Sequence, residues 1–302
     1  MKKYIIFDIG GTFVKWAVLN ENYDLIENNK FAVDASEKDC QVEMVPKIVD
    51  TVEQLRSKYP DLCGIGISTA GDVDPQSFEI IGSVPNHKNY AGTNYKQVFK
   101  KYLDLGWDLI VMNDANAAVM GEYVKGQLQG VSDAIMITLG TDIGAGIILN
   151  NQLFSGCNGC AGEVGYLNVL DRRYGTYFSA IGLKRLAKEF NLIDPNQHIE
   201  PAEILKNSDH KFDQLIEYWY QGLAIGLANL IALFNPKKII IGGGLSDSKM
   251  LDLNRIETII NKNLIEKHLM KMYQLELALH GNHAALYGCL YFLKQVKNKE
   301  SK

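Results

Sequence analysis

Two glycine-containing segments carry residue types that could hold a phosphate group: Asp8-Ile-Gly-Gly-Thr12 and Gly140-Thr-Asp-Ile-Gly-Ala-Gly146. Each lies between two short apolar runs, which predicts a β-hairpin with a glycine turn. Adjacent glycines allow backbone N–H groups to approach a phosphate closely. Thr12 adds a hydroxyl donor, and Asp8 offers a hard oxygen to Mg²⁺. One such loop alone would be read as an ordinary turn, but its recurrence favours phosphate binding.

A possible general base stands at Asp114, directly after Asn113. These residues follow an expected strand at Leu109–Met112 and precede an expected helix at Ala115–Lys125. A carboxylate there could accept the proton of an attacking hydroxyl. Capping of the following helix is the alternative interpretation, and the two roles are compatible.

A third glycine-rich segment, Gly159-Cys-Ala-Gly-Glu163-Val-Gly-Tyr166, contains one acidic and one aromatic residue. In a cleft, Glu163 could accept hydrogen bonds from sugar hydroxyls, and Tyr166 could stack or donate. Taken alone, the segment would be a loop with a solvated glutamate. Cys157 and Cys160 precede it, but a structural zinc needs four ligands, and no Cys or His lies between 161 and 197. We therefore predict no zinc site there and inert thiols.

The expected elements repeat along the chain, each half giving strand, glycine loop and strand, followed by helices and further strands. The apolar runs predict strands at Tyr4–Phe7, Val14–Leu19, Cys63–Ser68, Leu109–Met112, Ala134–Leu139, Ile147–Leu149 and Lys238–Ile241. Helical spacing predicts helices at Lys47–Tyr59, Ala115–Lys125, Phe212–Phe234 and Ala284–Lys294, with Gly222 and Gly226 interrupting the third.

The composition sets the class of protein. The chain has 302 residues, enough for about two domains, and 31 basic against 35 acidic side chains give a net charge of -4. That balance argues against a nucleic-acid partner. Five cysteines and a short apolar start indicate a reduced, cytoplasmic protein without a signal peptide. The richest apolar stretch, Leu223–Phe234, is too short to span a membrane.

Together these motifs resemble the ROK family of sugar kinases, within the actin/hexokinase-like ATPase superfamily. The resemblance covers nearly the whole chain and rests on the two glycine loops, the Asn113-Asp114 pair and three further segments, Ile67–Gly71, Ala161–Tyr166 and Ile240–Gly244. It implies an α/β, two-lobed actin/hexokinase-like (ribonuclease H-like) fold with ATP and a hexose in the cleft. The lobes would be residues 1–117 plus 284–302, and residues 118–283.

The resemblance also implies a role for each matched residue. Asp114 would be the general base, and the sugar would contact Gly71, Asn86, Asn113, Asp114, Glu163 and Tyr166. The phosphates would lie against Gly10, Gly11, Thr12, Gly140, Thr141 and Asp142. Asp8 would approach Mg²⁺ through water or phosphate, and Gly243 and Gly244 would flank the adenosine. The family is commonly dimeric, so a homodimer is expected.

This sequence departs from the family pattern at three places. The usual zinc cluster is missing, and Tyr166 stands where its preceding histidine should be. Gly175 takes the place of a sugar-binding glutamate, and Asp142 replaces a glycine of the second phosphate loop. Because a carboxylate repels phosphates unless Mg²⁺ intervenes, we expect either weaker ATP binding or direct help from Asp142 with the metal.

The resemblance implies phosphorylation of a sugar hydroxyl, typically O6. The segments Pro85–Tyr95 and His283–Leu290 look most like N-acetylmannosamine kinases, with β-glucoside kinases and glucokinases as alternatives. A sugar-binding or regulatory protein without catalysis is an alternative of another class, supported by Asp142 and Gly175. A sugar-responsive repressor is disfavoured, because the motif at Asp8 leaves no room for an N-terminal DNA-binding domain.

Overall fold

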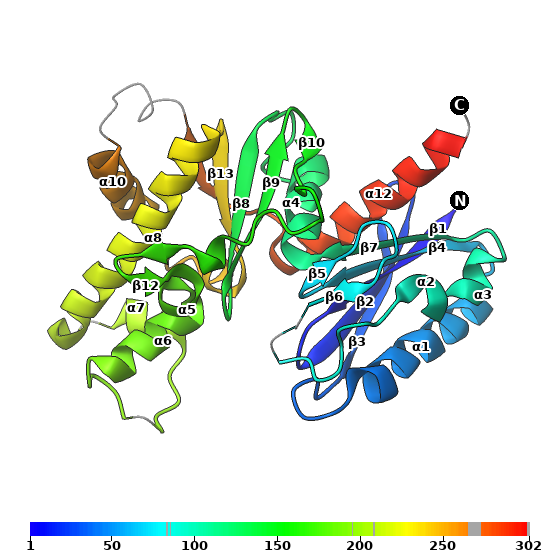
Figure 1. Cartoon of the computed structure of the whole chain (residues 1–302), viewed down its shortest axis with the longest axis horizontal. Coiled ribbons are helices and arrows are strands. Elements are labelled where there is room, and N and C mark those ends of the chain that lie inside the picture. The colour runs from blue at the N-terminus through cyan, green and yellow to red at the C-terminus, as the bar shows by residue number, and fades with distance from the viewer. Residues whose placement is uncertain (83, 85, 195, 208, 265–272, 301–302) are drawn as a thin grey trace. The chain divides into compact units, whose positions relative to one another are not determined.

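The protein, represented by a computed structural model, divides into two compact units (Figure 1). The structure describes residues 1–300 except 83, 85, 195, 208 and 265–272, so Pro85 of the segment noted above lies outside the described residues. The first unit comprises Met1–Lys125, Ser155–Ala161 and His283–Lys302, and the second comprises Gly126–Phe154 and Gly162–Asn282.

The first unit is built on a five-stranded mixed sheet in the order β3-β2-β1-β4-β7. β1 pairs antiparallel with β2 and parallel with β4, which in turn pairs parallel with β7. These strands are β1 (Lys3–Ile9), β2 (Phe13–Asn20), β3 (Leu25–Ala32), β4 (Leu62–Thr69) and β7 (Asp108–Asn113). The shorter β5 (Asp72–Val73) and β6 (Ile80–Ile81) form a separate ribbon.

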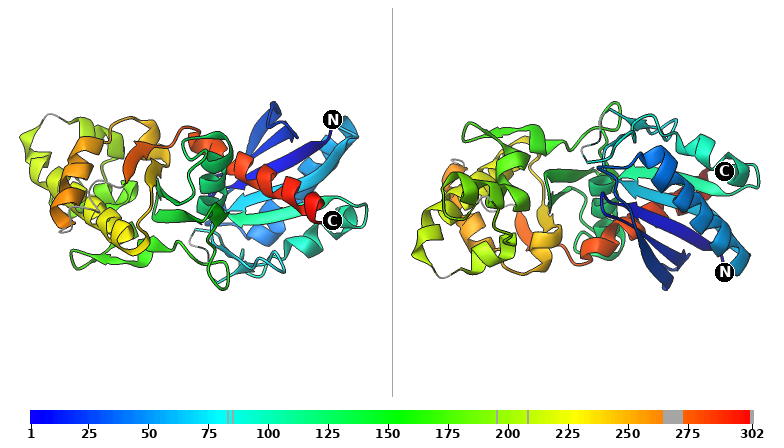
Figure 2. Two further views of the ribbon diagram at one scale, coloured as in Figure 1. Left: turned by 90° about the horizontal axis from the view of Figure 1, so that it is seen from above. Right: turned by 90° about the horizontal axis from the view of Figure 1, so that it is seen from below.

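Helices cover both faces of this sheet. Seen from above, α12 (Ala284–Glu300) crosses one face, and seen from below, α1 (Val45–Lys58) crosses the other (Figure 2). Two single-turn helices, α2 (Tyr95–Val98) and α3 (Lys100–Leu103), follow the ribbon. The apolar positions Ile48, Val52 and Leu55 of α1 are buried with Ile5 and Phe7 of β1. The helix spacing expected for this segment is therefore confirmed.

The helix α4 (Asp114–Lys125) packs against α12 with almost no space between the two backbones. A Cβ atom on Gly121 would lie 1.8 Å from the carbonyl oxygen of Ala284, and one on Gly288 would lie 1.9 Å from that of Ala117. Only glycine fits such an approach. This packing keeps the whole of α4 in the first unit, whereas the predicted limit at residue 117 would fall inside the helix.

The second unit repeats the same sheet topology in the order β10-β9-β8-β13-β14. β8 pairs antiparallel with β9 and parallel with β13, and β13 pairs parallel with β14. The strands are β8 (Ala134–Leu139), β9 (Ile143–Leu149), β10 (Gln152–Leu153), β13 (Lys238–Gly242) and β14 (Gln274–Leu277). The repeat expected from the sequence is thus present as a repeated sheet.

In the described part of the second unit, six α-helices pack with the sheet and contribute much of the core. They are α5 (Tyr174–Phe178), α6 (Ala180–Glu189), α7 (Pro201–Lys206), α8 (Asp213–Phe234), α9 (Gly244–Asp247) and α10 (Leu253–Asn263). A two-stranded ribbon, β11 (Asn168–Val169) with β12 (Arg172–Arg173), precedes α5. Contrary to expectation, α8 is unbroken at Gly222 and Gly226. The rings of Phe178 and Tyr174 pack where side chains at these two positions would stand, so the glycines allow close packing rather than interrupting the helix.

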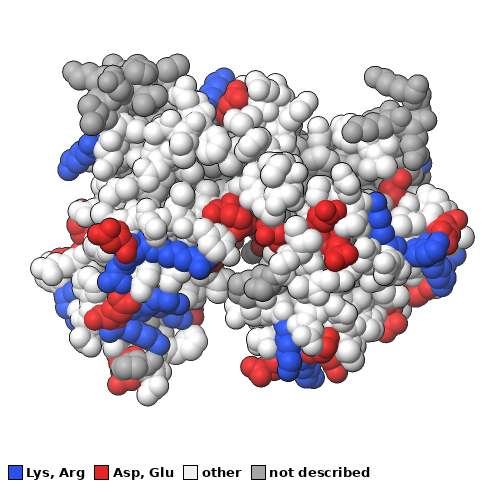
Figure 3. Space-filling model, viewed as in Figure 1, with Lys and Arg blue, Asp and Glu red and all other residues white. Residues whose placement is uncertain are grey.

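The surface agrees with the small net charge. On the face shown in Figure 3, Lys and Arg side chains are interspersed with Asp and Glu. Among the described residues, none of the helices is both long and apolar enough to cross a bilayer.

Candidate active site

The first group of predicted site residues lies at one edge of the first sheet. The parallel strands β1, β4 and β7 are in register so that Ile9 pairs with Thr69 and Thr69 with Asn113. The carboxyl ends of parallel strands are where open α/β sheets bind ligands. Asp8, Gly71 and Asp114 therefore come together although the sequence separates them widely.

The carboxylate of Asp8 is held by two side chains that the sequence analysis did not single out. Ser68 donates its hydroxyl to Asp8 Oδ1 at 3.1 Å, and the ammonium of Lys15 lies 3.6 Å from Oδ2. Burial nevertheless raises the pKa of Asp8 above its usual value, with Lys15 and Ser68 acting in the opposite direction. Lys15 could have been found from the hairpin register, because β2 pairs it directly with Asp8.

Asp114 begins α4 and is exposed to solvent. Two effects raise the pKa of Asp114 to about 6: the larger is desolvation of the carboxylate by the surrounding protein, and the smaller is the negative charge of Asp8. Hydrogen bonding from the Ala115 N–H to Asp114 Oδ1, at 2.7 Å, acts in the opposite direction. A carboxylate that is reachable by solvent and titrates near neutrality can take up a proton from a bound hydroxyl group.

Asn113 is the helix cap that the alternative interpretation expected. Its Oδ1 accepts from the N–H groups of Ala115 and Asn116, at 3.0 and 3.2 Å. Its Nδ2 also donates to the carbonyl oxygen of Gly71 at 3.2 Å, which joins the ends of β7 and β4. Gly71 has φ +89°, and a Cβ there would lie 2.6 Å from a methyl group of Val84. Both its conformation and its surroundings thus require glycine.

The first glycine hairpin is braced by the segment that contains Asn86. The N–H of Ala35 donates to Gly11 O at 3.1 Å, and the N–H of Lys88 donates to Ala35 O at 2.7 Å. Asn86 itself has φ +61°, and its carbonyl oxygen lies 3.7 Å from the position of a Cβ on Gly11. The predicted sugar contact and the predicted phosphate loop are therefore neighbours within the first unit.

A buried chain of hydroxyl groups fixes the far end of this segment. The hydroxyls of Thr69 and Tyr90 are 2.7 Å apart, and those of Tyr90 and Tyr95 are 2.9 Å apart. All three residues are buried. Because Thr69 ends β4, this chain ties the segment to the same sheet edge that carries Gly71 and Asn113.

The second glycine hairpin is braced by the start of α6. Gly140 N–H donates to Asp142 O at 3.1 Å within the turn. The carbonyl of Gly140 accepts from the Ile181 N–H at 3.3 Å, and that of Thr141 accepts from the Ser179 hydroxyl at 3.2 Å. The backbone of the turn is thus held by its own unit.

Gly243 lies against the strand that enters this hairpin. It has φ +91°, and a Cβ there would be 2.6 Å from the carbonyl oxygen of Leu139, the residue before Gly140. By contrast, a Cβ on Gly244 would meet nothing within 4 Å. The two glycine-rich sequences of the second unit therefore meet at the ends of β8 and β13.

Glu163 and Tyr166 lie on a short turn that docks on β9. The N–H of Ala145 donates to Gly162 O at 3.0 Å, and both Glu163 and Tyr166 are exposed. The guanidinium of Arg173 lies over the ring of Tyr166, 4.0 Å from its centre. Asp142 lies beside this turn, as described below. Cys157 and Cys160 belong to the 155–161 loop of the first unit.

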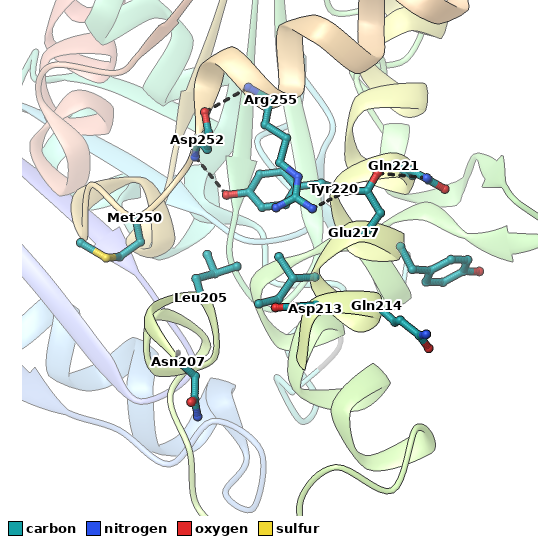
Figure 4. Close-up of a pocket in the computed structure, with 12 residues that line it drawn as sticks. Leu205, Asn207, Asp213, Gln214, Glu217, Tyr220, Gln221, Met250, Asp252 and Arg255 are labelled. Atoms are coloured by element: carbon teal, nitrogen blue, oxygen red, sulfur yellow. Dashed lines mark hydrogen bonds and ion pairs between the residues drawn. The ribbon is translucent and has the colours of Figure 1, made fainter. Parts of the chain in front are cut away.

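A large pocket of the second unit contains none of the predicted site residues. It has a volume of about 880 Å³ and is lined by α7, α8, α10 and neighbouring loops (Figure 4). Arg255 forms an ion pair with Glu217 and lies over the ring of Tyr220 at 4.7 Å. The hydroxyl of Tyr220 accepts from the Asp252 N–H at 3.0 Å. These contacts join α8 to α10, which is a structural role.

Comparison with known proteins places the chain among sugar kinases. The sequence model of the ROK family matches residues 4–296. A β-glucoside kinase of Listeria monocytogenes is 29% identical over 98% of this chain and 99% of its own length. A glucokinase of Streptomyces griseus, solved with glucose and AMPPNP, is 28% identical with a TM-score of 0.80 over 97% and 99% of the two chains.

A further solved structure, a Listeria monocytogenes protein assigned provisionally as an N-acetylmannosamine kinase, has a TM-score of 0.83 and 27% identity. It covers 98% of this chain and 99% of its own. These structural matches confirm the expected two-lobed actin/hexokinase-like fold.

Proposed function

This chain belongs to the ROK family, and on that basis we propose that it is an ATP-dependent kinase that phosphorylates a hydroxyl group of a hexose. The observation that carries the proposal is Asp114, a solvent-exposed carboxylate with its pKa raised to about 6 at the edge where β1, β4 and β7 end. Asp114 accepts the proton of the attacking hydroxyl, typically O6. Asn113, Gly71, Asn86, Glu163 and Tyr166 contact the sugar.

The nucleotide is held by the two glycine hairpins. Gly10, Gly11 and Thr12 of the first unit and Gly140 and Thr141 of the second direct backbone N–H groups and hydroxyls to the phosphates. Gly243 and Gly244 flank the adenosine. The part of the site that removes the proton and the part that binds the phosphates are thus carried by different segments.

The residues around Asp8 fit a magnesium ion. Its carboxylate is a hard oxygen donor at a strand end, and the ammonium of Lys15, 3.6 Å away, indicates that the position attracts positive charge. Asp8 would hold Mg²⁺ through water or the nucleotide phosphates. The ion would neutralise charge on the transferred group.

We propose N-acetylmannosamine as the first substrate to test, because the Pro85–Tyr95 and His283–Leu290 segments resemble kinases for that sugar and the provisionally assigned relative agrees. Glucose and β-glucosides are the other substrates of the panel, since relatives are named for them. The homodimer common in the family and a cytoplasmic location belong to the same proposal.

The proposal is tested by measuring ADP release with ATP and Mg²⁺ over a panel of hexoses, N-acetylated amino sugars and β-glucosides. We expect turnover of one class well above the rate without sugar, and its loss in Asp114→Asn. If no sugar of the panel increases ADP release but one of them binds in calorimetry, the protein is a sugar-binding protein without kinase activity.

A further inference from the structure

The side chain of Asp142 enters a slot formed by two glycines that are distant in sequence. A Cβ on Gly175 would lie 1.4 Å from Asp142 Oδ1, and a Cβ on Gly165 would lie 2.6 Å from the same atom. Both glycines are buried. Asp142 Oδ1 therefore occupies the volume in which a side chain at position 175 would begin, so the slot exists only while both positions remain glycine.

The other carboxylate oxygen of Asp142 faces a cationic group. Asp142 Oδ2 lies 3.9 Å from the guanidinium of Arg173, which in turn lies over the ring of Tyr166. The side chain of Asp142 is 54% exposed. One oxygen is thus fixed in the slot while the carboxylate stays accessible to a ligand.

Most of the hydrogen bonds that hold the hairpin run through the backbone of Gly140, Thr141 and Asp142, and to Ile181 and Ser179. One of them uses this carboxylate, because Asp142 Oδ1 accepts from the Ile143 N–H at 2.7 Å, and Oδ2 is therefore the oxygen left for a ligand. The carboxylate also contacts the turn that carries the two proposed sugar contacts, since Gly165 lies between Glu163 and Tyr166. A carboxylate repels phosphates, but it accepts hydrogen bonds from hydroxyl groups readily.

We propose that Asp142 is a sugar-binding residue that determines specificity, and that its carboxylate replaces the side chain missing at Gly175. It accepts a hydrogen bond from a sugar hydroxyl through its accessible side, while Gly165 and Gly175 fix its position. This differs from the expectation that Asp142 serves ATP or the metal, and it rests on the proposed function.

The first test separates the two substrates kinetically. With the sugar found in the panel, Asp142→Asn should raise the sugar KM by roughly tenfold, because a neutral amide replaces the charged acceptor and one of its two oxygens becomes a donor. The KM for ATP and the Mg²⁺ requirement should change less than twofold. Asp171→Asn, which removes an exposed carboxylate from the turn just before Arg172 and Arg173, is the control. The proposal is overturned if the ATP KM rises as much as the sugar KM, or if neither changes.

The second test removes the carboxylate at position 142 and restores one at position 175. Asp142→Gly should raise the sugar KM as Asp142→Asn does, and adding Gly175→Glu to Asp142→Gly should bring it back at least part of the way. The same Gly175→Glu substitution in the unchanged background should impair the enzyme, because the two side chains compete for one volume. Absence of any rescue, with the double variant folded, contradicts the proposed replacement.

Thermal unfolding tests the slot without relying on catalysis. Gly175→Ala should lower the melting temperature when Asp142 is present and lower it much less in the Asp142→Gly background, since coupled neighbours are not additive. Equal effects in both backgrounds would overturn the inference even if the kinase reaction is confirmed. Conversely, unequal effects in a protein that turns over no sugar would contradict the proposed function while leaving the slot established.

Discussion

The two units share one sheet topology but place their acidic groups differently. In the first unit, the parallel strands β1, β4 and β7 end in Ile9, Thr69 and Asn113, with Asp8 just before Ile9 and Asp114 just after Asn113. In the second, the corresponding strands end in Leu139, Gly242 and Leu277, and the one acidic residue of the hairpin, Asp142, lies on the turn itself. The same sheet topology thus carries its acidic residues at the strand ends in one unit and on the hairpin turn in the other.

The first unit places two acidic groups so that one shifts the pKa of the other, while Asp142 of the second unit contacts two glycines and an arginine. Asp8 raises the pKa of Asp114, so the two carboxylates act on each other. Asp142 instead fills a glycine slot and faces Arg173. We therefore expect substitutions at Asp8 and Asp114 to change rates and pH dependence, and substitutions at Asp142 or at the glycines of the second unit to change affinity or stability.

The strongest test of this division is Asp114→Asn. If proton removal belongs to the first unit, kcat should fall by roughly 10²- to 10⁴-fold, the range typical of general base catalysis. The measurement is steady-state ADP release, with Asp104→Asn as a control for loss of an exposed carboxylate. Near-normal turnover in Asp114→Asn would break the comparison, because the base would then lie elsewhere.

The second test addresses the backbone of the second unit. Gly243→Ala should destabilise the protein by roughly 1–3 kcal/mol, because glycine alone tolerates its φ of +91° and its contact with Leu139. Gly244→Ala, whose Cβ would meet nothing within 4 Å, should change stability by less than about 1 kcal/mol. Urea unfolding of both variants measures the difference. Equal stabilities would show that Gly243 is not required by packing.

The third test is the pH dependence of kcat/KM. Because Asp114 must be deprotonated to act as a base, activity should fall as the pH drops through about 6. Asp8→Asn removes the neighbouring negative charge, so the pKa of Asp114 should fall and the acidic limb should move to lower pH. A limb that stays in place, or moves upward, would contradict the coupling between the two carboxylates.

The same raised pKa has a consequence for stability. The folded protein holds the Asp114 proton more tightly than the unfolded chain does, so this group favours folding below its ordinary pKa and loses that contribution as the pH rises through about 6. Asp114→Asn should therefore unfold at a higher temperature than the unchanged protein at pH 7, and the difference should shrink at pH 4. Calorimetry at the two pH values measures it.

The smallest expected effect concerns Lys15. The Lys15 side chain is 44% exposed and its ammonium lies 3.6 Å from Asp8, so Lys15→Met should cost less than about 1 kcal/mol of stability. Removing the positive charge should raise the pKa of Asp8 further, since Lys15 now lowers it. Thermal unfolding and the Mg²⁺ concentration for half-maximal activity check the two effects. A large loss of stability would mean that Lys15 has a packing role.

The sequence predicted most of the scaffold because local patterns determine it. Alternating and continuous apolar runs located the strands on either side of both glycine turns, and the spacing of Ile48, Val52 and Leu55 located α1. The extent of the first unit was harder to predict. It depends on the contact of Gly121 with Ala284 and of Gly288 with Ala117, which joins residues more than 150 positions apart.

The candidate site was predictable where a motif carries it and not where tertiary contacts do. Asp8 and Asp114 stand in recognisable motifs, and the sheet register brings them to one edge. The contacts of Ser68 with Asp8 and of Asn113 with Gly71 need the fold. Most clearly, Asp142 and Gly175 are two separate departures in the sequence, but the folded chain makes them one feature.

The hydrogen bonds from the Ala35 N–H to Gly11 O and from the Lys88 N–H to Ala35 O connect the first hairpin to the segment that contains Asn86, so a change in one is passed to the other. A ligand that orders one of them also orders the other, which lowers the entropy that the next ligand must lose. We therefore expect the two substrates to bind with positive cooperativity, each tightening the affinity for its companion by the same factor.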